Sequence, residues 1–138
     1  MLTEHEGKRQ FAYQDSGNKW HIGVGRNIDE GGGLGLSEDE IDFLLENDIV
    51  RCMKELANAF PWYSTLDEVR QDVLVMMAFN LGLTRLRGFN RALAACQAGD
   101  YEVCAAEMLD SRWAEQIGDR SRVLSTMMAT GEYADGTP

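Results

Sequence analysis

The spacing of the apolar residues changes near residue 37 of this 138-residue chain, and this change constrains the fold more than any other feature. Between Phe11 and Ile28 the apolar side chains nearly alternate with polar ones, as in strands that bury one face. The run Ser16-Gly17-Asn18 interrupts the alternation and predicts a hairpin turn. After residue 37 the apolar residues follow a helical period. The sequence therefore predicts an α+β fold, with a small β-hairpin first and helices afterwards.

Capping signals predict where the helices begin and end. Ser37 and Glu40 have the spacing of a capping box, and they predict a long helix whose outer face carries an acidic run. Thr65 with Glu68 predicts the start of a second helix, and Gly82 its end. Further helices are expected over residues 89–97, 100–109 and 120–129.

Composition and charge argue against several classes of protein. The net charge of −10 argues against binding to nucleic acid and against adhesion to an anionic membrane. The longest apolar run, residues 73–79, is far shorter than a membrane-spanning helix, and residues 1–15 contain no apolar core of a signal peptide. The histidine and cysteine spacings fit no common metal motif. We expect a monomer without a metal ion, without a cofactor and without stable membrane insertion.

Three ionisable residues near the N-terminus stand out as candidates for catalysis. Glu6 lies near the end of a short polar segment, about residues 2–10, that is compatible with a helix, and a glycine follows it. Asp15 precedes the predicted turn, and His21 lies on the returning strand. A helix end packed across the hairpin would bring the three side chains to one cleft. Hydrolysis of a glycosidic bond uses such a pair of carboxyl groups, one protonated and one ionised. The spacing alone is equally compatible with an ordinary pair of surface acids.

A set of motifs in a fixed order resembles the phage-type lysozymes, glycoside hydrolase family 24. The stretch HEGKRQFAYQDSGNKWHIGVGRNI carries the family's E-G…Y-x-D…G-x-G frame, including the spacing from Glu6 to Asp15. The motifs MMAFNLG, GFNRAL, SRW and TGEY follow in the same order, so that the resemblance covers about residues 2–133. It implies one lysozyme-like domain over 1–138, with the active-site cleft between a small N-terminal lobe and a helical lobe. We expect the N-terminal lobe at about 1–36, a linking helix at 37–57, the helical lobe at 58–133 and a tail at 134–138.

The resemblance also implies an activity. The chain would be an N-acetylmuramidase that cleaves the β-1,4 bond between N-acetylmuramic acid and N-acetylglucosamine in peptidoglycan. Glu6 would be the general acid, Asp15 would remain ionised and orient water, and Arg120 or Arg122 would position Glu6. His21 occupies a position where the family usually has threonine, and three roles are open to it. It could position water as threonine does, deprotonate that water, or attack the anomeric carbon itself.

The resemblance further implies which residues contact the glycan strand. The matching positions lie on the hairpin side and at the end of the second predicted helix: Gly25, Asn27, Phe79, Asn80 and Gly82. Phe79 fits a core residue as well as a sugar platform, because apolar residues surround it in the sequence. Ala92 and Glu107 also match contact positions, but they differ in type from the residues expected there.

The implied biology is that of an endolysin. It would accumulate in the host cytoplasm, reach the cell wall after holin-type release and lyse the cell. Two other functions fit the same sequence. One is a non-catalytic peptidoglycan-binding module on the same fold, which retention of both Glu6 and Asp15 argues against. The other is a protein-interaction role for the acidic face of residues 38–48.

Overall fold

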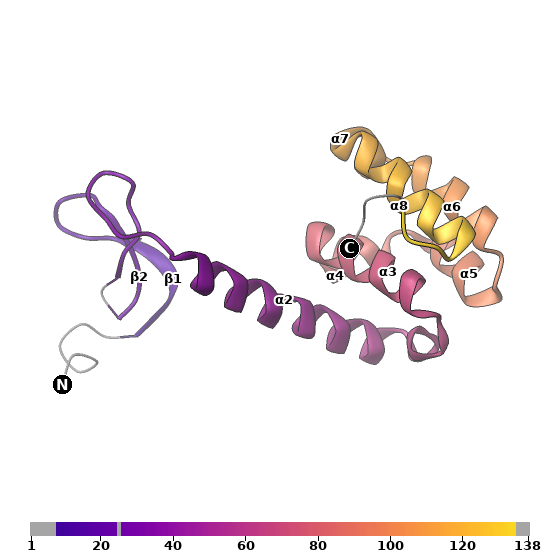
Figure 1. Ribbon diagram of the computed structural model, residues 1–138, viewed down its shortest axis with the longest axis horizontal. Coiled ribbons are helices and arrows are strands. Elements are labelled where there is room, and N and C mark those ends of the chain that lie inside the picture. The colour runs from indigo at the N-terminus through magenta and orange to yellow at the C-terminus, as the bar shows by residue number, and fades with distance from the viewer. Residues whose placement is uncertain (1–7, 25, 135–138) are drawn as a thin grey trace. The chain divides into compact units, whose positions relative to one another are not determined.

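The structure is a computed structural model that describes residues 8–24 and 26–134. The chain divides into two compact units, residues 1–46 and 47–138. A small sheet lies in the first unit and a cluster of short helices in the second (Figure 1). The α+β class expected from the sequence is confirmed.

The sheet of the first unit has three antiparallel strands in the order β1-β2-β3. They are β1 (Arg9–Gln14), β2 (Trp20–Gly23) and β3 (Arg26–Asn27). In the tight turn between β1 and β2, the Asn18 amide donates a hydrogen bond to the Asp15 carbonyl over 3.0 Å. Asn18 has a positive φ of 61°, which asparagine tolerates better than most residues. The predicted hairpin is confirmed, and β3 extends it by a short third strand.

A glycine-rich loop leads from the sheet to helix α2 (Glu38–Ala59). The loop folds closely onto Asn27, since a Cβ atom on Gly33 would lie 2.5 Å from Asn27 Oδ1. Only glycine fits there without a shift of the backbone. At the start of α2 the Ser37 amide donates to Glu40 Oε1 over 3.0 Å, and the Glu40 amide donates to Ser37 Oγ over 3.3 Å. These reciprocal bonds confirm the predicted capping box.

The second unit consists of short helices around an apolar core. A 3₁₀ helix (Pro61–Thr65) precedes α3 (Glu68–Leu81), α4 (Leu83–Arg87), α5 (Asn90–Ala98), α6 (Tyr101–Leu109), α7 (Arg112–Ile117) and α8 (Asp119–Thr130). In Figure 1, α8 runs beside α6, and residues that both helices contribute are fully buried. The largest fully buried side chains of the core are Leu56, Leu74, Met77, Leu86, Met108, Met127 and Met128.

The start of α3 differs from the prediction. Thr65 ends the 3₁₀ helix and donates its hydroxyl proton to the Trp62 carbonyl over 2.6 Å. The N-cap of α3 is Asp67, whose carboxylate accepts from the Arg70 amide over 3.2 Å. The expected start at Thr65 is therefore wrong, because the hydroxyl serves the preceding turn. Among the described residues, no helix combines the length and the apolar character needed to cross a membrane.

Candidate active site

Asp15 directly follows β1, and the tight turn fixes its carboxylate. Its Oδ1 atom accepts hydrogen bonds from the Gly17 amide over 2.8 Å and from the Lys19 amide over 2.9 Å. This is the Asx-turn geometry that aspartate favours between two strands. The orientation of the carboxylate is thus set by the hairpin itself.

His21 lies on β2, and its imidazole contacts the other oxygen of the same carboxylate. The distance from His21 Nε2 to Asp15 Oδ2 is 2.7 Å, and the side chains are 15% and 38% exposed. An ionised carboxylate only accepts hydrogen bonds, so Nε2 carries the proton in this contact. Asp15 and His21, two of the predicted catalytic residues, therefore form a hydrogen-bonded dyad with a fixed imidazole direction.

Hydrogen bonds keep Asp15 ionised. The pKa of its carboxyl is lowered from the usual value, with the Lys19 amide as the largest cause. The His21 side chain and the Gly17 amide lower this pKa further, while desolvation by burial raises it. An ionised carboxylate beside an imidazole fixes the direction of that ring through their hydrogen bond. The dyad can therefore hold a polar hydrogen, orient a water molecule or stabilise positive charge.

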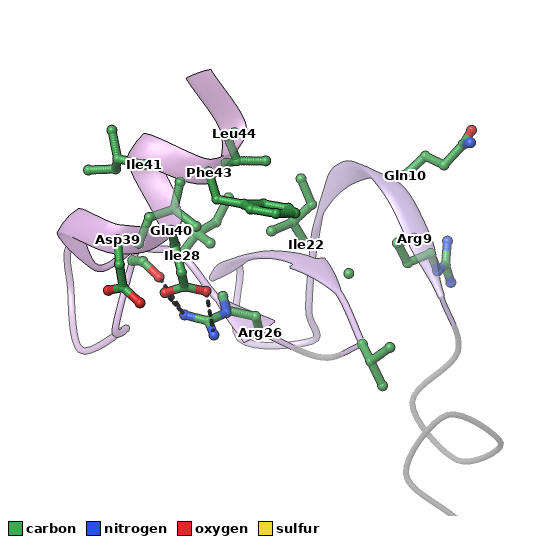
Figure 2. A pocket seen from close by; sticks show the side chains of 14 residues that line it. Arg9, Gln10, Ile22, Arg26, Ile28, Asp39, Glu40, Ile41, Phe43 and Leu44 are labelled. Atoms are coloured by element: carbon green, nitrogen blue, oxygen red, sulfur yellow. Dashed lines mark hydrogen bonds and ion pairs between the residues drawn. The ribbon is translucent and has the colours of Figure 1, made fainter. Parts of the chain in front are cut away.

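The first unit also has a large open groove on the other face of the sheet (Figure 2). It has a volume of about 1160 Å³ and is lined by apolar side chains that include Ile22, Phe43 and Leu44. Ile22 lines this groove, whereas side-chain alternation places its neighbour His21 on the opposite face. The charged groups drawn in Figure 2 include an ion pair, in which Arg26 Nη2 lies 2.8 Å from Glu40 Oε2. Arg9 also lines the groove, and its described lining includes neither member of the dyad.

Two of the predicted residues, Glu6 and Gly25, lie outside the described residues. Asn27, a predicted glycan contact, accepts hydrogen bonds from within the protein. Its Oδ1 atom accepts from the Asp29 amide over 2.9 Å, and its backbone oxygen accepts from the Leu34 amide over 3.0 Å. The backbone oxygen of Asn27 thus holds the glycine-rich loop in place, and its side-chain oxygen binds the Asp29 amide.

The other predicted glycan contacts lie at the C-terminal end of α3. Asn80 Oδ1 accepts from the Trp113 indole Nε1 over 3.1 Å, which leaves the amide nitrogen as the outward-facing donor. Phe79 is 51% exposed, so the structure disagrees with its interpretation as a core residue. Gly82 ends the helix with a positive φ of 79°.

The remaining candidates lie on α5, α6 and α8. Arg120 and Arg122 are exposed on the first turn of α8, where Arg122 Nη1 lies 3.8 Å from Asp119 Oδ1. Ala92 and Glu107 line one pocket of about 390 Å³. These two positions, which differ in type from the residues expected there, thus lie at one pocket of the second unit.

Sequence reasoning missed the aromatic partner of His21. Tyr13 lies directly opposite His21 in the pairing of β1 with β2, and the two rings stack with centroids 5.7 Å apart. The signal was present, because a turn centred on residues 16–18 pairs position 13 with position 21.

Acid is expected to unfold the first unit. Hydrogen bonds lower the pKa of four of its carboxyl groups, those of Asp15, Asp29, Asp39 and Glu40. A lowered pKa in the folded state gives a stabilisation that is complete above the unfolded pKa and is lost as the pH falls through the folded pKa. We expect the Trp20 indole NMR signal to leave its folded position between about pH 4 and pH 2. A Trp20 signal unchanged at pH 2 would contradict this expectation.

Comparison with known proteins identifies the family of this chain. A family model described as phage lysozyme matches residues 3–129. The chain is 24% identical over 157 aligned residues to probable T4-type lysozyme 2 of Dictyostelium discoideum, covering 95% of this chain and 92% of the relative. It is 24% identical to the endolysin of Acyrthosiphon pisum secondary endosymbiont phage 1, covering 88% of this chain and 81% of the relative.

A further relative is a much longer protein. The chain is 31% identical over 111 residues to the pre-baseplate central spike protein Gp5 of Enterobacteria phage T4. The match covers 78% of this chain but spans only 19% of the spike protein. Since the family model covers nearly the whole chain, the chain belongs to the phage lysozyme family, a family of lysozyme-type glycoside hydrolases.

Proposed function

We propose that this chain is an N-acetylmuramidase that hydrolyses the β-1,4 bond between N-acetylmuramic acid and N-acetylglucosamine in bacterial peptidoglycan. The observation that carries the proposal is the dyad, in which Asp15 Oδ2 and His21 Nε2 lie 2.7 Å apart. Family membership supports the class of reaction, and the dyad supports the site at which it takes place.

In the proposed reaction Glu6 protonates the glycosidic oxygen as the bond to the anomeric carbon breaks. Asp15 stays ionised, since hydrogen bonds lower its pKa, and its charge stabilises the positive charge that develops on the sugar ring. Arg120 or Arg122 would position the Glu6 carboxyl. The exposed ring of Phe79, with Asn80, Gly82, Gly25 and Asn27, would hold the glycan strand.

His21 would direct the attacking water. Because its Nε2–H is given to Asp15, the imidazole has a fixed direction and a fixed tautomer, as in other carboxylate–histidine pairs. An imidazole held in this way can orient water and accept its proton, which leads to inversion at the anomeric carbon. Direct attack by His21 would instead give a covalent intermediate and retention.

The biological role that fits this activity is host lysis. We propose that the chain acts as an endolysin on the cell wall after release from the cytoplasm through a holin-type lesion. A relative that covers most of the chain carries the name endolysin, which supports this role.

Digestion of purified peptidoglycan tests the proposed reaction. We expect the wild-type protein to release new reducing ends of N-acetylmuramic acid, with the α-anomer appearing first in proton NMR spectra. Reducing ends of N-acetylglucosamine, or no reducing ends at all, would contradict the proposed activity. The β-anomer appearing first would be consistent with the muramidase activity and would make His21 a candidate for the nucleophile.

A further inference from the structure

Three side chains of the hairpin form a column that ends at the dyad. The Tyr13 ring stacks on the His21 imidazole with centroids 5.7 Å apart and 27° between the planes. The Arg9 guanidinium carbon lies 4.8 Å from the centroid of the same Tyr13 ring. The pairing of β1 with β2 accounts for the first contact, because Tyr13 and His21 are directly opposite each other.

Two contacts on the hairpin restrict the imidazole of His21. The hydrogen bond from Nε2 to Asp15 fixes the direction of one ring atom. The Tyr13 ring fixes the plane of the imidazole, because aromatic pairs hold a preferred stacked arrangement. Arg9 stabilises the tyrosine ring in turn by a cation–π contact. A catalytic group must be held to a fraction of an ångström, so the stacking contact has a direct consequence for the reaction rate.

We propose that Tyr13 is the positioning residue of His21 and that it acts through its aromatic ring, with Arg9 holding that ring in place. The inference rests on the proposed role of His21 in directing water. Tyr13 touches neither the reacting sugar nor water in this account, so it affects the turnover number kcat and not the binding of glycan. The column also depends on the register of the hairpin, because a shift of one residue would separate the Tyr13 and His21 rings.

Two substitutions of Tyr13 distinguish the contribution of its aromatic ring from that of its hydroxyl group. In Tyr13→Phe the ring remains, and we expect kcat on peptidoglycan to stay near the wild-type value. In Tyr13→Leu the stack is lost, and we expect kcat to fall roughly tenfold or more with KM unchanged. Phe11→Leu is the matched control, because Phe11 is on the same strand and 80% exposed. Equal losses in Tyr13→Phe and Tyr13→Leu would overturn the role of the ring.

The imidazole itself gives a readout that does not depend on activity. The chain has two histidines, so the signals that vanish in His21→Thr identify the ring protons of His21 by NMR. We expect these signals to move in Tyr13→Leu, which lacks the ring current, and to stay in place in Tyr13→Phe. Unmoved signals in a folded Tyr13→Leu protein would overturn the stacking contact.

The same variants distinguish failure of this inference from failure of the proposed function. Wild-type kcat in His21→Ala would remove the catalytic role of His21, and the positioning role of Tyr13 with it. An inactive His21→Ala together with wild-type kcat in Tyr13→Leu would overturn the role of Tyr13 alone. Where Tyr13→Leu fails to fold, Arg9→Met tests the column, with a smaller loss of kcat expected.

Discussion

The Asp15→Asn variant is expected to lose about 10²- to 10⁴-fold in kcat on peptidoglycan while remaining folded. The asparagine oxygen can go on accepting from Gly17 and Lys19, so the tight turn should persist. The second oxygen is replaced by an amide nitrogen that donates hydrogen bonds and now faces His21 Nε2. The imidazole must accept at Nε2 and carry its proton on Nδ1, which is the wrong tautomer for the proposed reaction.

The matched control for this variant is Asp29→Asn. Asp29 also accepts hydrogen bonds from two backbone amides, those of Gly31 and Trp20, and its pKa is also lowered. It does not belong to the dyad, and we expect kcat of Asp29→Asn to remain within about twofold of wild type. Glu6→Gln removes the proposed general acid, and we expect it to be the least active variant in the same assay. An Asp15→Asn protein with wild-type turnover would contradict the proposed role of the dyad.

Local signals in the sequence predicted the parts of the fold that depend on neighbouring residues. The hairpin and the capping box are built from side chains a few positions apart, such as Ser37 and Glu40, so composition and spacing suffice to identify them. The start of α3 was misplaced by two residues because both Thr65 and Asp67 can cap a helix. The choice between these two caps depends on the 3₁₀ helix before α3, which no local sequence pattern predicted.

The short elements β3, α4 and α7 were not predicted for a similar reason. Each spans two to six residues, which is too short for an apolar period to emerge. Tertiary contacts define them instead. Trp113 of α7, for example, is buried and donates its indole proton to Asn80, 33 positions away.

The candidate site was predictable where the hairpin brings its residues together. Asp15 and His21 are six positions apart across a short turn, so any tight hairpin places them side by side. The role of Tyr13 required the strand register, and the hydrogen bond that fixes Asn80 required the fold of the whole second unit. Residue types alone could mark these positions as candidates, but they could not show which atoms these side chains contact.

Arg70→Met is expected to give the largest loss of stability in the second unit. Arg70 lies on α3, and its side chain is only 14% exposed. Its Nε and Nη2 atoms donate to the backbone oxygens of Met128 and Ala129 over 2.7 Å and 3.1 Å, and its guanidinium carbon lies 3.6 Å from the Tyr101 ring centroid. One guanidinium therefore caps the C-terminus of α8 and joins it to α3 and α6.

The loss of stability in Arg70→Met follows from the backbone carbonyls that the substitution leaves without a donor. The last carbonyls of a helix have no partner within the helix, and a partly buried carbonyl without a donor is destabilising. Loss of two charge-assisted hydrogen bonds should lower the free energy of unfolding by about 3 kcal/mol and the midpoint of thermal unfolding by at least about 10 °C.

Arg122→Met provides the matched control, because Arg122 also pairs with an aspartate three residues before it. That pair is almost fully exposed and has a nitrogen–oxygen distance of 3.8 Å, so its loss should change stability by less than about 0.5 kcal/mol. Thermal unfolding followed by circular dichroism at 222 nm, a wavelength that reports helix content, compares the two variants. Similar midpoints for Arg70→Met and Arg122→Met would show that the contacts of Arg70 with Asp67 and with α8 add no more stability than one exposed ion pair. A large loss confined to Arg70→Met would identify the guanidinium as the link between the closing helix and the core.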